Sequence, residues 1–248
     1  MAVIAGNWKM HMGPAETRDF FGALDLSGVS ALHELLVFPP SVSLSAAAVT
    51  DTRDPRVQLG VQNIHWEDSG AFTGEVSAAM AAAAGGTFAL IGHSERRHVF
   101  GETDEETALK VRAARRHALV PVFCVGETID ERRAGRVEEV ILRQLDAGLA
   151  DLGTDGLRFL VAYEPVWAIG TGETATPQDA SQAHATLRAR LEDALGLAAA
   201  ARVPLLYGGS VKPGNAAELL AAPEVDGVLV GGASLEAASF AAIAAAGS

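Results

Sequence analysis

The chain has 248 residues, of which 49% are hydrophobic and 20% charged, which is enough to bury one sizeable core. Its formal net charge of −12 argues against nucleic acid or an anionic membrane as a partner, because both require a basic surface. Cys124 is the one cysteine, which excludes an internal disulfide and fits a reducing compartment. The N-terminus lacks a signal-peptide pattern and no stretch reaches the ~18 apolar residues of a membrane span, so we expect a cytoplasmic protein.

Short apolar runs with strand character alternate with helical segments along the whole chain. The predicted strands are 3–8, 35–38, 57–62, 87–91, 120–125, 157–163, 203–207 and 228–230. Helix starts follow several of them. Thr103 with Glu106 forms a capping-box pattern, Thr176 precedes a proline, and Asn215 and Ser234 are predicted to cap the last two helices.

Strand–helix alternation predicts a parallel sheet, and eight strand–helix units predict its closure into a (β/α)8 barrel. No linker, charge block or low-complexity insert divides the units, so we expect a single domain over residues 1–248. An open parallel sheet is the alternative, which we favour less because no edge strand is obvious.

Reactive residues of such a barrel lie at the carboxyl ends of its strands. The polar and glycine residues at the predicted ends are Asn7, Lys9, His93, Glu95, Glu164, Ser210, Gly231 and Gly232. Closure of the barrel would bring the first and the last of them to one rim. The cation, the imidazole and the carboxylate together indicate proton transfer next to a carbonyl group.

Glu164 ends the apolar run 157–163 and directly precedes Pro165, so we expect a strand end to hold it while the loop up to Gly172 can move. A fixed carboxylate beneath a hinged, partly apolar lid suits proton abstraction in a site that excludes water. We expect Trp167 to anchor this lid and Glu127 to be structural. The alternative for Glu164 is a strand cap that pairs with a neighbouring Arg or Lys.

Glycine pairs follow the last two predicted strands, at Gly208-Gly209 and Gly231-Gly232. Glycines there let backbone N–H groups approach an anion, and barrels often bind phosphate at this place. Three other residues named in the sequence could have structural rather than catalytic roles. His93 could be a hydrogen-bonded structural group, Lys9 a solvated cation and Cys124 a buried small hydrophobe. We expect Arg96 and Arg97 to brace the rim against Glu75 or Glu102.

Seven ordered motifs resemble those of the triosephosphate isomerases, over essentially the whole chain. They are Gly6-Asn7-Trp8-Lys9-Met10, Gly70-Ala71-Phe72-Thr73-Gly74-Glu75, Gly92-His93-Ser94-Glu95-Arg96-Arg97, Cys124-Val125-Gly126-Glu127, residues 163–172, Tyr207-Gly208-Gly209-Ser210-Val211 and Val230-Gly231-Gly232-Ala233-Ser234. The resemblance implies a TIM barrel that interconverts D-glyceraldehyde 3-phosphate and dihydroxyacetone phosphate through an enediolate, in glycolysis and gluconeogenesis, without a cofactor. We also expect no metal, because no cluster of His, Cys and carboxylate with ligand spacing appears at the predicted strand ends.

The resemblance also implies a role for each matching residue. Glu164 would be the base and His93 the neutral imidazole; triosephosphate isomerase is itself a reference example of this pairing. Lys9 and Asn7 would be electrophilic and positioning groups, with Glu95 as the carboxylate that supports them. Backbone groups would hold the phosphate at Gly170, Ser210, Gly231 and Gly232. Thr73 would be a loop tip received by a second subunit, which implies a homodimer.

Three residues depart from the family pattern: Glu173 at the end of the lid, where many relatives have lysine, and Phe38 and Val61 near strand ends. Three other functions stay open. A close relative could isomerise a four-carbon ketose phosphate, a Schiff-base aldolase could use Lys9 or Lys212, and the barrel could bind phosphate without catalysis.

Overall fold

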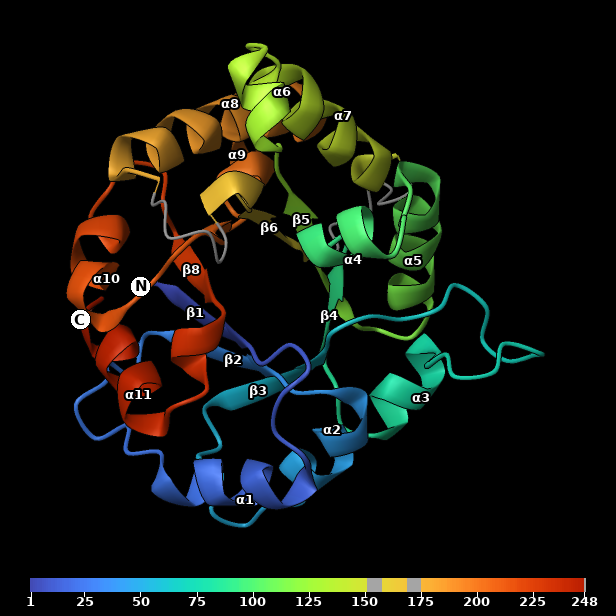
Figure 1. Cartoon of the computed structure of the whole chain (residues 1–248), viewed down its shortest axis with the longest axis vertical. Coiled ribbons are helices and arrows are strands. Elements are labelled where there is room, and N and C mark those ends of the chain that lie inside the picture. Colours follow the sequence, from blue (N-terminus) through green and yellow to red (C-terminus); the bar gives the residue numbers. More distant parts are fainter. Residues whose placement is uncertain (151–157, 169–174, 248) are drawn as a thin grey trace.

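The structure is a computed structural model that describes residues 1–150, 158–168 and 175–247. Parallel strands form a closed barrel in sequence order, and the last strand pairs with the first (Figure 1). The strands are β1 (Val3–Asn7), β2 (Glu34–Phe38), β3 (Val57–Val61), β4 (Phe88–Ile91), β5 (Val120–Val125), β6 (Leu160–Tyr163), β7 (Leu205–Tyr207) and β8 (Gly227–Val230). The predicted (β/α)8 barrel is confirmed, and the assignment of residues 1–248 to one domain stays a prediction.

Helices surround the barrel on its outer side (Figure 1). They are α1 (Pro14–Ala23), α2 (Ser41–Ala48), α3 (Ala78–Ala83), α4 (Ser94–Val99), α5 (Asp104–Arg116), α6 (Ile129–Arg133), α7 (Val137–Leu149), α8 (Pro177–Leu195), α9 (Leu197–Ala200), α10 (Pro213–Leu220) and α11 (Ala237–Ala245). Among the described residues, none of these helices combines the length and the apolarity that a membrane crossing needs.

The predicted helix starts are confirmed at two sites and wrong at two others. Thr103 and Thr176 cap α5 and α8 with complete capping boxes. Asn215 lies inside α10, because Pro213 starts that helix two residues earlier and the Asn215 side chain accepts the N–H of Lys212. Ser234 ends a short 3-10 helix, η2 (Gly232–Ser234), and its hydroxyl donates to the Gly231 carbonyl, while α11 begins later.

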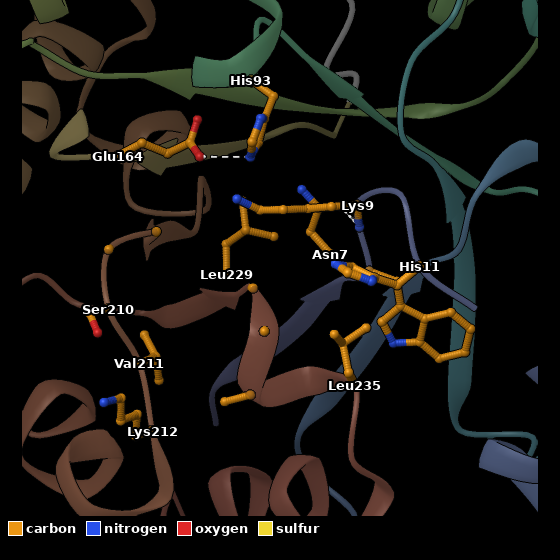
Figure 2. Close-up of a pocket in the computed structure, with 16 residues that line it drawn as sticks. Asn7, Lys9, His11, His93, Glu164, Ser210, Val211, Lys212, Leu229 and Leu235 are labelled. Carbon is orange, nitrogen blue, oxygen red and sulfur yellow. Dashed lines mark hydrogen bonds and ion pairs between the residues drawn. The ribbon is translucent and has the colours of Figure 1, made fainter. Parts of the chain in front are cut away.

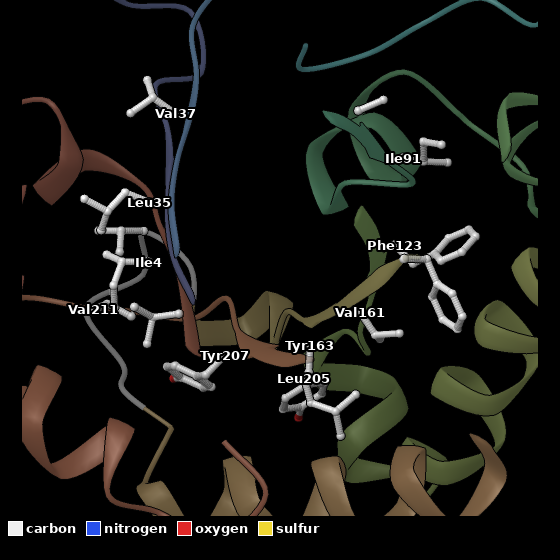
Figure 3. Close-up of a cluster of buried hydrophobic side chains, with 14 of the residues drawn as sticks. Ile4, Leu35, Val37, Ile91, Phe123, Val161, Tyr163, Leu205, Tyr207 and Val211 are labelled. Atoms are coloured by element: carbon white, nitrogen blue, oxygen red, sulfur yellow. The ribbon is translucent and has the colours of Figure 1, made fainter. Parts of the chain in front are cut away.

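Two layers of apolar side chains stabilise the barrel. Along β2, Leu35 and Val37 belong to the outer layer (Figure 3). Leu36 and Phe38 alternate with them and belong to the inner layer, as expected for a strand buried on both faces. Cys124 belongs to the inner layer, which confirms it as a buried small hydrophobe, and burial raises the pKa of its thiol. The family departures at Phe38 and Val61 are also fully buried.

Phe38 fits inside the barrel because the neighbouring strand carries no side chain opposite it. A Cβ placed on Gly60 of β3 would lie 2.2 Å from the Phe38 ring. The large residue at position 38 therefore occupies space that Gly60 leaves open, so the packing accommodates this departure from the family pattern.

His184 of α8 is a buried ionisable group outside the candidate site. Its Nδ1 lies 2.8 Å from the Glu224 carbonyl oxygen, and its ring packs edge-on against Tyr163. Its Nε2 has no hydrogen-bond partner in the described part of the chain. Burial lowers the pKa of His184 from 6.5 to about 4, so the folded protein keeps this ring neutral at pH values where the unfolded chain protonates it.

We expect His184 to lower the free energy of unfolding as the pH is reduced from 6.5 to about 4. Above pH 6.5 it should have no such effect. The unfolded state binds the extra proton there, so at ~1.4 kcal/mol per pKa unit the loss approaches about 3 kcal/mol. Urea unfolding across this range, compared with His184→Phe, isolates the contribution of the histidine from that of the carboxylates. An NMR titration that found His184 protonated near pH 6.5 would contradict the expectation.

Candidate active site

A cavity of about 300 Å³ opens at the carboxyl ends of the strands (Figure 2). Its lining is Asn7, Trp8, Lys9, His11, His93, Glu164, Gly208, Gly209, Ser210, Val211, Lys212, Leu229, Gly231, Gly232, Ala233 and Leu235. Residues from the first and last strands meet here because β8 pairs with β1. Of the predicted site residues, Glu95 lines an adjoining cavity instead, and Gly170 lies outside the described residues.

Glu164 follows β6 directly, and its backbone N–H donates to Val125 at the end of β5. The side chain is 3% exposed, and its carboxylate accepts hydrogen bonds from the N–H and the hydroxyl of Ser94. Nε2 of His93 lies 3.0 Å from Glu164 Oε1 (Figure 2). No Arg or Lys of the described residues forms an ion pair with Glu164, so the structure does not support the strand-cap alternative.

The Glu164 carboxylate is stabilised as an anion despite its burial. Burial alone raises the pKa of Glu164, whereas His93, the Ser94 N–H and Lys9 lower it, and the net shift is downward. A general base must be ionised to accept a proton, so these contacts keep Glu164 in the required state at neutral pH.

His93 is the N-cap residue of α4, a short helix that the sequence did not predict. Its Nδ1 accepts the N–H of Glu95 at 3.2 Å, so the proton of the neutral ring belongs on Nε2, which faces Glu164. Burial lowers the pKa of His93 and the Glu164 carboxylate raises it, with a net upward shift. A second ring proton would have to displace the Glu95 N–H from Nδ1, which opposes that shift.

Lys9 reaches the cavity from the loop after β1, and its Nζ lies 2.7 Å from Glu95 Oε1. Its backbone has φ of 50°, a strained value for a residue other than glycine. The Asn7 side chain accepts the Lys9 N–H at 3.0 Å, and Gln62 donates to the Lys9 carbonyl at 2.8 Å. These two side chains hold the strained residue in place, and the sequence had given no signal for the part played by Gln62.

The glycine pairs line the cavity, and Ser210, which follows the first pair, lies across from His93 in Figure 2. A Cβ on Gly208 would come within 2.8 Å of the Glu164 side chain, and one on Gly209 within 2.1 Å of the Tyr207 hydroxyl. Glycine is therefore required at position 208 for the loop after β7 to approach the carboxylate, whereas Gly231 and Gly232 have room for a Cβ. Lys212 adds a positive charge to this wall of a protein whose net charge is −12.

The residues around the rim differ in one respect from the sequence prediction. Arg96 pairs with Glu102 at 2.6 Å, as predicted, but Arg97 pairs with Asp104 at 2.7 Å and with neither predicted glutamate. Asp104 is the first residue of α5 and lies within reach of the Arg97 guanidinium. The prediction for Arg97 is therefore wrong.

Trp167 at the base of the predicted lid donates from Nε1 to Glu127 at 2.8 Å, and the Arg132 guanidinium lies over its ring. Glu127 is fully buried and also accepts from the Tyr163 hydroxyl. These contacts support the structural roles expected for Trp167 and Glu127. The predicted lid residues at 169–174, Gly172 and Glu173 among them, lie outside the described residues.

A family model described as triosephosphate isomerase matches residues 2–247. A triosephosphate isomerase of Symbiobacterium thermophilum is 50% identical over 252 residues, covering 98% of this chain and 96% of that protein. A triosephosphate isomerase of Moorella thermoacetica is 51% identical over 242 residues, covering 97% of this chain and 96% of that protein. A third, of Chloroflexus aurantiacus, is 48% identical, covering 96% of each.

Proposed function

The chain belongs to the triosephosphate isomerase family, and we propose that Glu164 and His93 carry the proton transfers by which it interconverts D-glyceraldehyde 3-phosphate and dihydroxyacetone phosphate. The observation that carries the assignment of roles is the 3.0 Å contact between His93 Nε2 and Glu164 Oε1 in a cavity that two glycine loops also line. A base, an N–H donor and an anion site thus surround a space that suits a small phosphorylated carbonyl compound.

In the proposed mechanism Glu164 removes a proton from the carbon next to the carbonyl group, and the electron pair forms an enediolate. The Nε2 proton of His93 and the Lys9 ammonium stabilise the charge that develops on the oxygen atoms. Glu164 then returns its proton to the neighbouring carbon, while His93 moves protons between the two oxygens. The balance of the reaction involves no oxidant, reductant or cofactor. Glu95 supports Lys9 through their ion pair, and Asn7 holds the Lys9 backbone.

The phosphate is proposed to bind to backbone N–H groups of Ser210, Gly231 and Gly232, with Lys212 contributing positive charge nearby. Gly170 is proposed as a further contact from the family resemblance alone. We also propose that the enzyme works in the cytoplasm, without nucleic acid or membrane as a partner.

A coupled isomerase assay on the purified chain tests this function. We expect turnover of both triose phosphates, and lower kcat/KM for a four-carbon ketose phosphate. Borohydride added with substrate should trap no lysine adduct, because the proposed chemistry forms no Schiff base. An adduct on Lys9 or Lys212 would favour the aldolase, and absent turnover would favour a phosphate-binding barrel.

We propose that the chain is a homodimer with Thr73 at the interface. Beside Thr73, the side chains of Phe72 and Phe100 are 43% and 69% exposed and line one cavity, and Met10 at the adjoining cavity is 94% exposed. Exposed apolar side chains gathered in one region indicate a contact surface.

Light scattering is expected to give the dimer mass at micromolar concentration, and Phe100→Asp is expected to shift the mass toward that of the monomer. Leu197→Asp is the matched control, because Leu197 is 70% exposed on α9 and should leave the mass unchanged. A parental chain that is monomeric and fully active at every concentration would contradict the proposal.

A further inference from the structure

Two oppositely charged side chains hold the peptide groups on either side of Gly92, the residue that precedes His93. The Gly92 N–H donates to Glu102 Oε1 at 3.0 Å, and the Gly92 carbonyl accepts from Arg97 Nε at 2.8 Å. Both charged side chains are almost fully buried, at 2% and 8% exposure. We call this pair of contacts the Gly92 clamp.

The backbone at Gly92 has the conformation that needs such support. Its φ is +73°, in the left-handed region that favours glycine, and a Cβ would lie 2.6 Å from the Arg97 guanidinium. Gly92 turns the chain from the end of β4 into α4, whose N-cap residue is His93. The direction of the His93 ring therefore depends on how the peptide groups at Gly92 are oriented.

Two cations, the partly exposed Arg96 and the buried Lys110, balance the charge of Glu102. Its Oε2 accepts from Arg96 Nε at 2.6 Å and from Lys110 of α5, which is itself 4% exposed. Burial raises the pKa of Glu102 while Lys110 and Arg96 lower it, and the net direction is downward, so the group is an anion at neutral pH. Lys110 also donates to Asn63 at 2.8 Å, and the adjacent Gln62 donates to the Lys9 carbonyl. A series of contacts thus links Gly92 to Lys9 through Glu102, Lys110 and the neighbouring residues Asn63 and Gln62.

We propose that Glu102 and Arg97 are positioning residues that act through Gly92 to aim the His93 Nε2–H at the substrate, an inference that rests on the proposed function. None of the residues that line the active-site cavity is part of the clamp, so the clamp acts on catalysis indirectly, and His93 is the cavity residue bonded directly to Gly92. A carboxylate that is paired with two cations and also accepts a backbone N–H fixes orientation more firmly than a neutral group.

Glu102→Gln keeps the shape of the side chain but removes its charge, so Arg96 and Lys110 compete with Gly92 for one amide oxygen. Since misplacement by ~1 Å can cost about 10²-fold in rate, we expect kcat to fall about 10- to 100-fold with a smaller change in KM. The matched control is Asp226→Asn. Asp226 likewise accepts a backbone N–H, from Leu205, and a guanidinium, from Arg188, but at the opposite end of the barrel. Asp226→Asn should leave kcat unchanged.

A double-mutant cycle separates positioning from general damage. In a His93→Gln background, Glu102→Gln should lower kcat no further, because the group through which it acts is already gone. In the otherwise parental chain, the NMR signal of the His93 Nε2–H should shift in Glu102→Gln and stay in place in Asp226→Asn. The proposal would be overturned if Glu102→Gln kept the parental kcat and left the His93 Nε2–H signal in place. It would also be overturned if Glu102→Gln lowered kcat in the His93→Gln background as much as it does in the parental chain.

Arg97→Lys provides a second route if Glu102→Gln does not fold. It keeps a positive charge near Asp104 but loses the contact with the Gly92 carbonyl, and the same shift of the His93 signal is expected. Failure of the proposed function has a different signature, since His93→Gln alone would then retain parental kcat. The NMR signal tests the clamp in either case.

Discussion

Replacement of Glu164 by glutamine is expected to lower kcat by about 10²–10⁴-fold, which is the usual contribution of a general base. Glutamine has nearly the same shape and can still accept the Ser94 N–H, which at present bonds to the carboxylate at 2.9 Å. It has no basic oxygen that could take a proton from carbon. The measurement is kcat in the coupled assay, with circular dichroism to show that the barrel is folded.

Glu218→Gln is the control, because Glu218 is an exposed residue of α10 and the same chemical change there should leave kcat unchanged. Glu164→Asp adds a graded comparison, since the carboxylate remains but is withdrawn from its position beside His93. If folded Glu164→Gln turned over at the parental rate, Glu164 would only be a structural residue at the end of β6.

Gly126→Ala is expected to lower kcat by about 10²-fold by displacing Glu164, although residue 126 does not line the cavity. A Cβ at this position would lie 1.8 Å from the Glu164 carbonyl oxygen. Gly126 cannot move away freely, because its N–H and its carbonyl both bond to the side chain of Gln144 on α7. The backbone of Glu164 must therefore shift, and overpacking should also lower the free energy of unfolding by about 1–3 kcal/mol.

Gly214→Ala is the matched control for this substitution. Gly214 lies in the first turn of α10, and nothing is within 4 Å of the position that its Cβ would take. The change should leave kcat unaltered and stabilise the protein by at most about 1 kcal/mol through helix propensity. Gly126→Ala with parental kcat would show that the close contact with Glu164 relaxes without consequence for catalysis.

Much of the candidate site could be predicted because strand ends are visible in the sequence. Glu164 and His93 each follow a buried apolar run, and parallel strands of one barrel end at the same rim. To predict that Glu164 and His93 lie close together, it was therefore enough to count the strands correctly. The cap predictions at Asn215 and Ser234 went wrong for a local reason, since a proline before one residue and a 3-10 turn at the other decide where each helix begins.

The sequence by itself determined the fold class and the family, because apolar runs and glycine motifs depend only on the order of residues along the chain. Only the tertiary structure decided which nitrogen of His93 carries its proton, since that depends on α4 placing the Glu95 N–H against Nδ1. It also decided the partner of Arg97 and the burial of Lys110 with Glu102. These contacts depend on the distances and directions that strand register, barrel closure and helix packing impose, which no spacing in the sequence specifies.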